Sequence, residues 1–508
     1  MARNRSLRRR RDQAPSVPQR PRRQMRNRFP PMEVVSADEL EAIHRASLRI
    51  LQETGMDFLH DEALAVLRKA GADVEANGHR VRFPSELVEQ AVAQAPAEFL
   101  LHARNPERTL SIGGNAMAVA CVASAPNVSD ADGGRRDGNF EDFRNLLRLA
   151  QSLNAVHLLG GYPVEPVDLP PRTRHLDALA AMLTLCDMPI HGYSLGRERI
   201  LDAIEMARIA RGLNHDDLLA QPSVFSIINS SSPLRLDTPM LDGVIELARH
   251  NQVMVLTPFT LSGAMAPASL AGALAQQNAE ALAGITLSQL INPGAPVMYG
   301  GFTSNVDLRS GAPAFGTPEY ARAVLVGGQL ARRYDLPYRS SNVCAANTVD
   351  AQSAYESMMS LWSTTLAHTN MLMHGTGWME GGLTASFEKM VLDADMLQMM
   401  AEFLQPLAVD DDALAVDAIG EVGPGGHFFG SPHTLARYET AFYQPILSDW
   451  RNFETWSEAG SPTTFEHANR TWKSLLAAYE EPPMDPAIRE ELDAFVARRT
   501  EEGGAPPL

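Results

Sequence analysis

Short apolar segments recur along the later two thirds of the chain. β-prone runs begin roughly 30 to 45 residues apart, near 157–162, 189–193, 223–229, 253–258, 296–302, 337–342, 370–376 and 414–419. Helical patterns fill the later gaps, at 269–290, 318–334, 350–368 and 386–404. Eight alternating units are typical of a (β/α)8 TIM barrel, and a doubly wound open sheet is the alternative. The chain lacks the glycine-rich turns of dinucleotide-binding and P-loop proteins.

A smaller unit of helices and a hairpin is predicted before the barrel. Ser36 and Glu39 form a capping box ahead of a helical run, and Asp61 can cap a second helix. Asn77-Gly78 marks a hairpin turn, and a third helix begins near Ser85. This spacing indicates an α+β extension that covers one end of the barrel or serves an oligomer contact.

Charge is distributed unevenly along the chain. The first 28 residues carry eleven Arg and one Asp, a net charge of +10. Because the net charge of the whole chain is −17, the remaining residues carry −27. Such an acidic body disfavours non-specific nucleic-acid binding. The Arg-rich head is predicted to be disordered, and contact with an acidic partner or RNA is the alternative. We expect four parts: a disordered tail at 1–28, the extension at 29–120, the barrel at 121–475, and a C-terminal helix and tail at 476–508.

The remaining composition is that of an ordinary globular protein. Apolar residues make up 45% of the 508 residues, and no run of about 18 uncharged apolar residues appears. Cys121, Cys186 and Cys344 are too sparse for a disulfide framework or a structural zinc site. The sequence also lacks HExxH and GxSxG. We therefore expect a cytoplasmic protein without a membrane segment or a metal site.

The residues at the predicted strand ends suggest a binding site for a cation or a flat ligand. In (β/α)8 barrels the active site lies at the carboxyl ends of the strands. Those positions hold few paired carboxylates and many aromatic, amide or small residues: Tyr162, Tyr193, Asn229, Phe259, Tyr299, Gly300, Gly301, Asn342, Gly375 and Trp378. Aromatic faces attract quaternary ammonium groups. The alternative is that these aromatics only pack the barrel rim.

Individual roles follow from this pattern. Glu380, just after Trp378, could face a cation, and His427 lies in a glycine-rich stretch that suits a polar contact. These two are the catalytic candidates. The substrate-binding candidates are Tyr299, Phe315, Asn342, Trp378, Arg309 and Phe428. Four glycines leave room for a cofactor or partner to approach, namely Gly300, Gly301, Gly425 and Gly426.

Several ordered stretches carry a resemblance to a known family. They include residues 126–130 (PNVSD), 230–234 (SSSPL), 270–280 (LAGALAQQNAE), 311–319 (GAPAFGTPE) and 423–428 (GPGGHF). In this order they make the chain, over about residues 30 to 490, similar to the trimethylamine methyltransferase family, which includes glycine betaine methyltransferases.

The resemblance implies an activity, a partner and a substrate class. It implies a barrel with no tightly bound cofactor and a corrinoid (cobalamin-binding) protein docked over the barrel mouth. Apart from the resemblance, we expect the chain to form a homo-oligomer. The Co(I) centre would attack an N-methyl carbon, and the amine would leave. Archaeal members that use trimethylamine carry pyrrolysine, whose position we place within 340–346, where this chain has only standard residues. This favours a quaternary amine such as glycine betaine.

Three alternatives stay open at this point. The carboxylate of a betaine could be bound by Arg309, Arg339 or His427. The same enzyme could act on trimethylamine or another methylated compound. A barrel that binds methylated amines in a regulatory role, without turnover, is the third possibility.

Overall fold

The computed structural model describes residues 17–506 and is built around one sheet of eight strands. Seven of the strands are parallel to their neighbours, and β1 joins one edge antiparallel. The order is β1 (Met25–Arg26), β7 (Ala116–Cys121), β19 (Met371–Thr376), β18 (Tyr338–Ser341), β15 (Val297–Gly300), β13 (Val253–Leu256), β11 (Val224–Ile228) and β10 (Ile190–His191). Because neighbours run the same way, their carboxyl ends share one edge.

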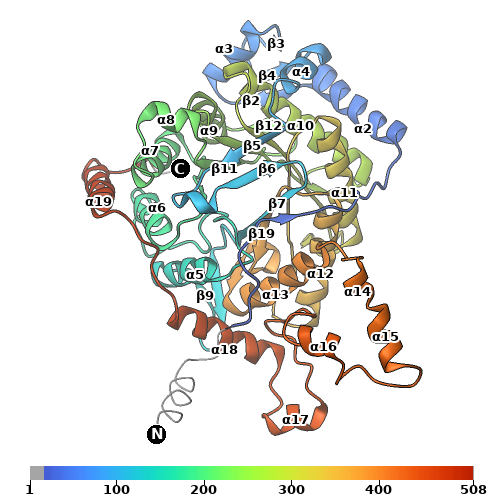
Figure 1. The fold of residues 1–508 in the computed structure, drawn as a ribbon. Coiled ribbons are helices and arrows are strands. Elements are labelled where there is room, and N and C mark those ends of the chain that lie inside the picture. Colours follow the sequence, from blue (N-terminus) through green and yellow to red (C-terminus); the bar gives the residue numbers. More distant parts are fainter. Residues whose placement is uncertain (1–16, 507–508) are drawn as a thin grey trace.

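Helices alternate with these strands and surround the sheet (Figure 1). They are α5 (Phe140–Ser152), α6 (Arg174–Leu185), α7 (Arg197–Ala210), α8 (His215–Ala220), α9 (Thr238–Arg249), α10 (Leu270–Ile291), α11 (Pro318–Arg333), α12 (Ala351–Leu366) and α13 (Phe387–Phe403). The four helices predicted over 269–404 are confirmed. Pro318 occupies the first turn of α11, where its missing N–H costs nothing, and Thr317 caps that helix.

Six of the eight predicted strands are confirmed, and the eighth is wrong. Residues 414–419 lie in two short helices, α14 (Asp411–Leu414) and α15 (Val416–Val422), neither of which has a buried residue. The apolar positions of residues 414–419 fit both the period of a strand and the period of a helix, so the local pattern does not distinguish the two. The parallel strand missed by the prediction is β7, which is buried at all six positions. Within 157–162 only Leu158 pairs, as an isolated bridge with Ala120.

The predicted extension forms a separate small sheet covered by helices. The helices are α2 (Ala37–Arg49), a π-helical turn (Ile50–Thr54), α3 (Asp61–Lys69) and α4 (Ser85–Val92), and the sheet order is β12 (Arg235–Leu236), β2 (Met56–Phe58), β4 (Arg80–Arg82) and β3 (Asp73–Val74). The capping box and the hairpin turn are confirmed. The cap of α3 is His60 and not Asp61, because the His60 ring accepts the Ala63 N–H.

A hairpin lies across one end of the sheet. It consists of β5 (Glu98–Leu101) and β6 (Leu110–Gly113), with a 3-10 turn at Pro106–Arg108 between them (Figure 1). Leu101, Leu110 and Ile112 cluster with Phe225 and Val253 of the parallel strands. The hairpin therefore closes the end of the sheet away from the strands' carboxyl ends.

The prediction of a disordered tail over residues 1–28 is wrong for residues 17–28, and residues 1–16 lie outside the described part. β1 pairs with β7 at Met25 and Met117. The Gln19 amide donates to the Ser152 carbonyl at 2.9 Å, and Arg22 donates to the His157 carbonyl at 3.2 Å. Composition indicated solvation, but backbone pairing to a sheet edge holds this segment in place.

Short strands and the C-terminal helices complete the fold. Two small sheets follow strands of the main sheet. One consists of β14 (Phe259–Ser262), β16 (Phe302–Val306) and β17 (Pro313–Ala314), and the other of β20 (Trp378–Met379), β21 (Thr384–Ser386), β8 (Asn127–Asp130) and β9 (Gly134–Asp137). A 3-10 turn (Glu380–Gly382) links β20 to β21. After α16 (Pro432–Arg437) and α17 (Phe453–Glu458), α18 (Thr464–Ala477) packs on α13 and α5, and α19 (Pro486–Glu501) on α6 and α7.

None of the helices described is both long and apolar enough to cross a membrane.

A buried ion pair ties α13 to the loop that follows β19. The Lys389 ammonium lies 2.5 Å from Asp393 Oδ1, and both side chains are completely buried. Lys389 also donates to the Ser357 hydroxyl of α12 at 2.7 Å, and Asp393 Oδ2 accepts the Gly377 N–H at 2.8 Å. Each charge is therefore compensated inside the protein, and the backbone just before Trp378 is held in one position.

We expect Lys389→Met to destabilise the protein by about 3–5 kcal/mol, because it leaves the Asp393 carboxylate buried without its cation. Denaturant unfolding at pH 7 measures this. The control is Lys473→Met, which removes an exposed ion pair with Asp132 and should cost about 1 kcal/mol or less. Equal effects of the two substitutions would contradict the assignment.

Candidate functional site

A cavity of about 410 Å³ lies at the carboxyl ends of the parallel strands. This volume suits a small organic ligand. Residues from nearly every strand of the sheet contribute to it, which is the arrangement expected where parallel strands end together. The lining residues are Ala123, Ser124, Gly160, Glu165, His191, Tyr193, Ser194, Leu195, Ile227, Asn229, Met240, Thr257, Phe259, Phe302, Arg339, Met373, His374, Trp378 and Gly382.

Aromatic rings form one wall of the cavity. The indole of Trp378 stacks on the His374 ring, with centroids 5.4 Å apart and an interplanar angle of 20°. Phe302 stands edge-on to Trp378 at 6.4 Å. A Cβ at Gly382 would lie 2.8 Å from the indole, so only glycine leaves room for this ring position. The wall therefore presents π-faces, which attract a cation.

A buried guanidinium faces the aromatic wall. Arg339, on β18, is 3% exposed, and its Nε and Nη1 have no hydrogen-bond partner among the described residues. Its guanidinium carbon lies 5.3 Å from the centre of the Phe302 ring. Burial lowers the pKa of Arg339 to about 10, so it remains charged at neutral pH. A buried charge of this kind is costly unless an anion accompanies it, and the cavity therefore favours a ligand with an acidic group.

The two cavity histidines are neutral at neutral pH. His191 Nε2 accepts the Ile227 N–H at 3.0 Å, which places the ring proton on Nδ1, an atom with no partner among residues 17–506. Burial, and then the charge of Arg339, lower the pKa of His191 to about 3 and that of His374 well below its usual range. Neither imidazole therefore repels a bound cation.

Glu165 is the carboxyl group of the cavity lining. Burial raises the pKa of Glu165, and Arg174, at 3.5 Å, partly opposes that rise. Together with Arg339, it gives the lining one acidic and one basic side chain. That pair of charges suits a zwitterion better than a ligand with a single charge.

Several predicted site residues lie at or directly behind the cavity. Trp378, Tyr193, Asn229 and Phe259 line it. Three others are buried outside the lining: Phe315 backs Trp378 at 5.2 Å, Asn342 donates to the Gly375 carbonyl at 3.2 Å, and Tyr299 is fully buried with its hydroxyl near Gln277. These positions can support the wall, and direct substrate contact by the three stays a prediction.

The first pair of glycines serves close packing. A Cβ at Gly300 would lie 2.1 Å from Thr257 Oγ1, and one at Gly301 would lie 3.0 Å from the Gln277 amide. Both glycines therefore allow the end of β15 to approach its neighbours. Contact of either with a cofactor stays a prediction.

The Glu380 carboxylate is already engaged by a cation of this chain. It accepts from Arg135 Nε at 2.9 and 3.2 Å and does not line the cavity. Its backbone is in the left-handed region, at φ 52°. The ion pair links the turn after Trp378 to β9, and a catalytic role of Glu380 stays a prediction.

The other predicted residues lie away from the cavity. Arg309 is exposed on the loop after β16, and Gly425, Gly426, His427 and Phe428 are exposed between α15 and α16. None of these five residues lines the cavity, so their roles also stay predictions. Within residues 17–506, no three His, Cys, Asp or Glu side chains are grouped as metal ligands.

Sequence reasoning missed three important lining residues, namely Phe302, His191 and His374, and held Arg339 only as one of three alternatives. A signal was present, because the histidines and the arginine interrupt strands that are otherwise apolar or small. A polar residue inside a buried strand requires a partner. Which of them face one cavity depends on how the strands curve.

Comparisons with known proteins identify the family of this chain. The model of the family "Trimethylamine methyltransferase (MTTB)" matches residues 1–504. The chain is 38% identical to a glycine betaine methyltransferase of Desulfitobacterium hafniense, over 94% of this chain and 99% of that protein. It is 29% identical to the trimethylamine methyltransferase MttB of the same species, over 92% and 94%, and 27% identical to MttB of Methanosarcina barkeri, with the same coverage.

A solved structure supports the fold alone. The crystal structure of the M. barkeri monomethylamine methyltransferase MtmB superposes with a TM-score of 0.51 at 11% identity, over 89% of this chain and 90% of that one. A mixed α/β fold with a small-molecule cavity at the strands' carboxyl ends, together with the full-length family match, defines a methyltransferase. The chain belongs to the trimethylamine methyltransferase family.

The depressed pKa of His191 generates a prediction about stability. Unfolded, this ring takes up a proton near pH 6.5, whereas in the folded protein it does so only near pH 3. The unfolded state therefore binds more protons between these values, and stability falls as pH falls through that window. The contribution of His191 is about 1.4 kcal/mol per pH unit. We therefore expect His191→Gln to lower the slope of the unfolding free energy against pH by this amount between pH 6 and pH 4.

The exposed His79 provides the matched control for this slope. His79→Gln should leave the pH dependence of unfolding unchanged. If His191→Gln behaved like this control, His191 would not be buried in its neutral form.

Proposed function

We propose that this methyltransferase takes a methyl group from a zwitterionic quaternary amine of the glycine betaine type and transfers it to the Co(I) of a corrinoid protein. The observation that carries the proposal is the buried guanidinium of Arg339 beside an aromatic wall, with Nε and Nη1 lacking a partner among the described residues. A betaine has one carboxylate for that guanidinium and one ammonium group for the wall.

The charges of the cavity favour a betaine over trimethylamine. The planar guanidinium of Arg339 presents Nε–H and Nη1–H donors that suit a carboxylate. Trimethylamine has no anionic group and would leave this charge unneutralised. The similarity to a glycine betaine methyltransferase over nearly its whole length supports the same substrate class.

The chain's contribution to the reaction is to position the substrate and exclude water. With the carboxylate on Arg339 and the ammonium group against Trp378, one N-methyl group can be directed toward the open carboxyl end of the sheet. A corrinoid carried by a partner protein would supply the Co(I) nucleophile there. The carbon–nitrogen bond breaks with its electron pair remaining on nitrogen, so the product amine leaves neutral without a proton donor.

The finer description of the fold also belongs to this proposal. We propose that the sheet closes as a (β/α)8 barrel, with residues 157–160 as the remaining strand between β7 and β10. In support, Leu158 forms a parallel bridge with Ala120, the His157 N–H donates to the Val119 carbonyl at 2.8 Å, and the Leu159 N–H donates to the Pro189 carbonyl at 2.9 Å.

The direct test uses free cob(I)alamin as the methyl acceptor. We expect the purified chain to form dimethylglycine from glycine betaine and to methylate the cobalt, which is followed by its visible spectrum. Trimethylamine should react much more slowly, because it does not neutralise Arg339. Faster reaction with trimethylamine would contradict the substrate assignment, and binding of betaine without methyl transfer to any corrinoid would support a regulatory role.

Substitution of Arg339 separates the two ends of the ligand. Arg339→Gln should weaken glycine betaine binding by about 2–5 kcal/mol, measured by calorimetry, because a buried charge pair is lost. Choline, which has the ammonium group but no carboxylate, should not bind more weakly to this variant than to the wild type.

Trp378→Ala is the matched control at the other end. It should weaken betaine and choline alike, by about 1–2 kcal/mol, because both place an ammonium group on the ring. Equal losses of betaine and choline in Arg339→Gln would exclude carboxylate binding by Arg339.

A further inference from the structure

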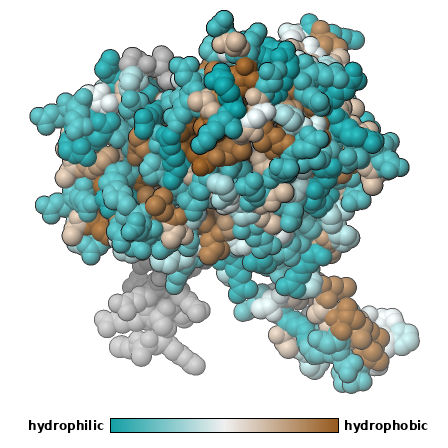
Figure 2. Space-filling view, turned by 90° about the horizontal axis from the view of Figure 1, so that it is seen from above, coloured by the Kyte–Doolittle hydropathy of each residue, from teal (hydrophilic) through white to brown (hydrophobic). Residues whose placement is uncertain are grey.

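Residues 407–453, which we call the arm, form an apolar segment that projects from the body and returns to it at the buried side chains of Ile446 and Leu447. The arm contains α14, α15 and α16 and ends at the start of α17; none of these four helices has a buried residue. Figure 2 shows brown surface on a lobe that stands apart from the rest of the molecule. Helices this short are unstable without burial of an apolar face. The short helices of the arm therefore need an apolar surface that the described residues of this chain do not provide.

The exposed apolar side chains of this protein are concentrated in the arm. Twelve of the twenty-four large apolar side chains exposed within the described residues lie between 407 and 453, although this is under a tenth of the chain. Leu407, Phe429, Tyr438 and Phe442 are each more than 80% exposed. Apolar surface of this extent marks an interface.

A second uncovered apolar surface lies on the body near the base of the arm. Tyr355 and Met359 of α12, Met399 and Phe403 of α13, and Phe29 are exposed and form what we call the patch. The Phe403 ring contacts Phe29 at 5.4 Å. The patch therefore reaches Phe403, four residues before the arm begins.

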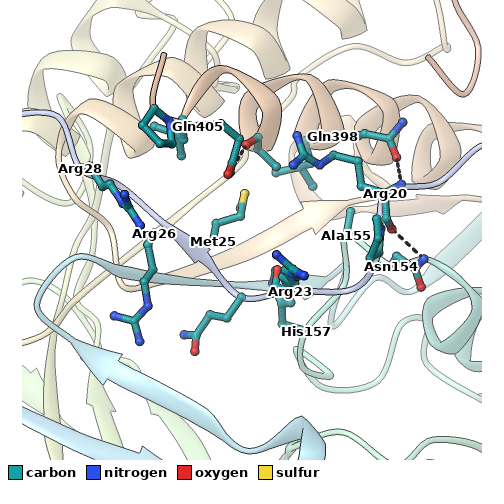
Figure 3. Close-up of a pocket in the computed structure, with 16 residues that line it drawn as sticks. Arg20, Arg23, Met25, Arg26, Arg28, Asn154, Ala155, His157, Gln398 and Gln405 are labelled. Atoms are coloured by element: carbon teal, nitrogen blue, oxygen red, sulfur yellow. Dashed lines mark hydrogen bonds between the residues drawn. The ribbon is translucent and has the colours of Figure 1, made fainter. Parts of the chain in front are cut away.

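Charge complements this apolar match. The arm has seven carboxylates and two arginines, and Arg437 and Arg451 are both paired within it. Beside the patch, a groove of about 400 Å³ is lined by Arg20, Arg23, Arg26 and Arg28 (Figure 3). Glu402 pairs with Arg20, and the pKa of Arg20 is lowered by burial and by the charge of Arg23. An acidic apolar segment fits this groove and the adjoining patch.

We propose that two copies of this chain exchange their arms, so that the arm of each covers the patch and the arginine groove of the other. Both halves of the interface are present on one chain, which is the requirement for a two-fold contact. One symmetric contact would then cover all of these surfaces at once. A typical interface uses 20–30 residues per partner, and interfaces between identical subunits are the more apolar class, which fits the arm.

The position of the arm leaves the cavity accessible. Gln405 and Pro406, directly before the arm, line the groove with Met25. Met25 pairs with Met117 near the amino end of β7. The cavity lies at the carboxyl ends of the strands. Exchange of arms therefore joins two copies by the ends opposite their ligand sites.

The test is the mass of the purified full chain by sedimentation equilibrium. The wild type should have the mass of two copies or a multiple of two. Phe429→Asp/Phe442→Asp in the arm, and separately Tyr355→Asp/Met359→Asp in the patch, should each weaken dimerisation at least tenfold. Leu308→Asp, at a side chain 75% exposed outside both surfaces, should not. Betaine binding and circular dichroism verify that each variant is folded.

Mixing the two double variants distinguishes reciprocal exchange from other modes of assembly. A mixed pair retains one intact contact, between the wild-type arm of the patch variant and the wild-type patch of the arm variant. The mixture should therefore form heterodimers more strongly than either variant pairs with itself. A monomeric wild type, an assembly of three, arm variants that assemble like Leu308→Asp, or a mixture no stronger than its components would overturn the proposal.

Discussion

The charge of one buried arginine determines most of the chemistry around it. Arg339 comes from the middle of the parallel sheet, where no carboxylate accompanies Nε and Nη1 among the described residues. Its field adds to burial in keeping His191 and His374 neutral, which leaves the aromatic wall free to hold a cation. An anionic group of a ligand would compensate the buried charge of Arg339. In the proposed function, the charge of the substrate, and not the size of the cavity, is the basis of selection.

The surrounding structure holds the groups that would meet such a ligand. The buried pair of Lys389 and Asp393 fixes the backbone at Gly377, directly before Trp378. Gly382 then leaves space for the indole, and Phe315 supports it from behind. These contacts come from three separate parts of the chain. A preorganised wall needs little rearrangement when a ligand binds, which helps to position a reacting methyl group.

The two ends of the sheet carry different features. The carboxyl ends carry the cavity, whereas the hairpin of β5 and β6, the arginine groove and the base of the arm lie toward the amino ends. In the proposed dimer, assembly at one end and chemistry at the other would allow a large partner protein to approach the cavity. The acidic apolar arm and the ordered residues 17–28, which form part of the groove, are consistent with this division.

The sequence by itself determined the alternation of strands and helices, the capping box at Ser36, the family and the place of Trp378 just after a strand, because these depend on local periodicity, local hydrogen bonding and ordered motifs. Only the tertiary structure decided that Arg339, and not Arg309 or His427, faces the cavity, and that 414–419 is helical while β7 belongs to the sheet. Burial and charge pairing arise between residues far apart in the chain, and local patterns contain no information about which strands become neighbours.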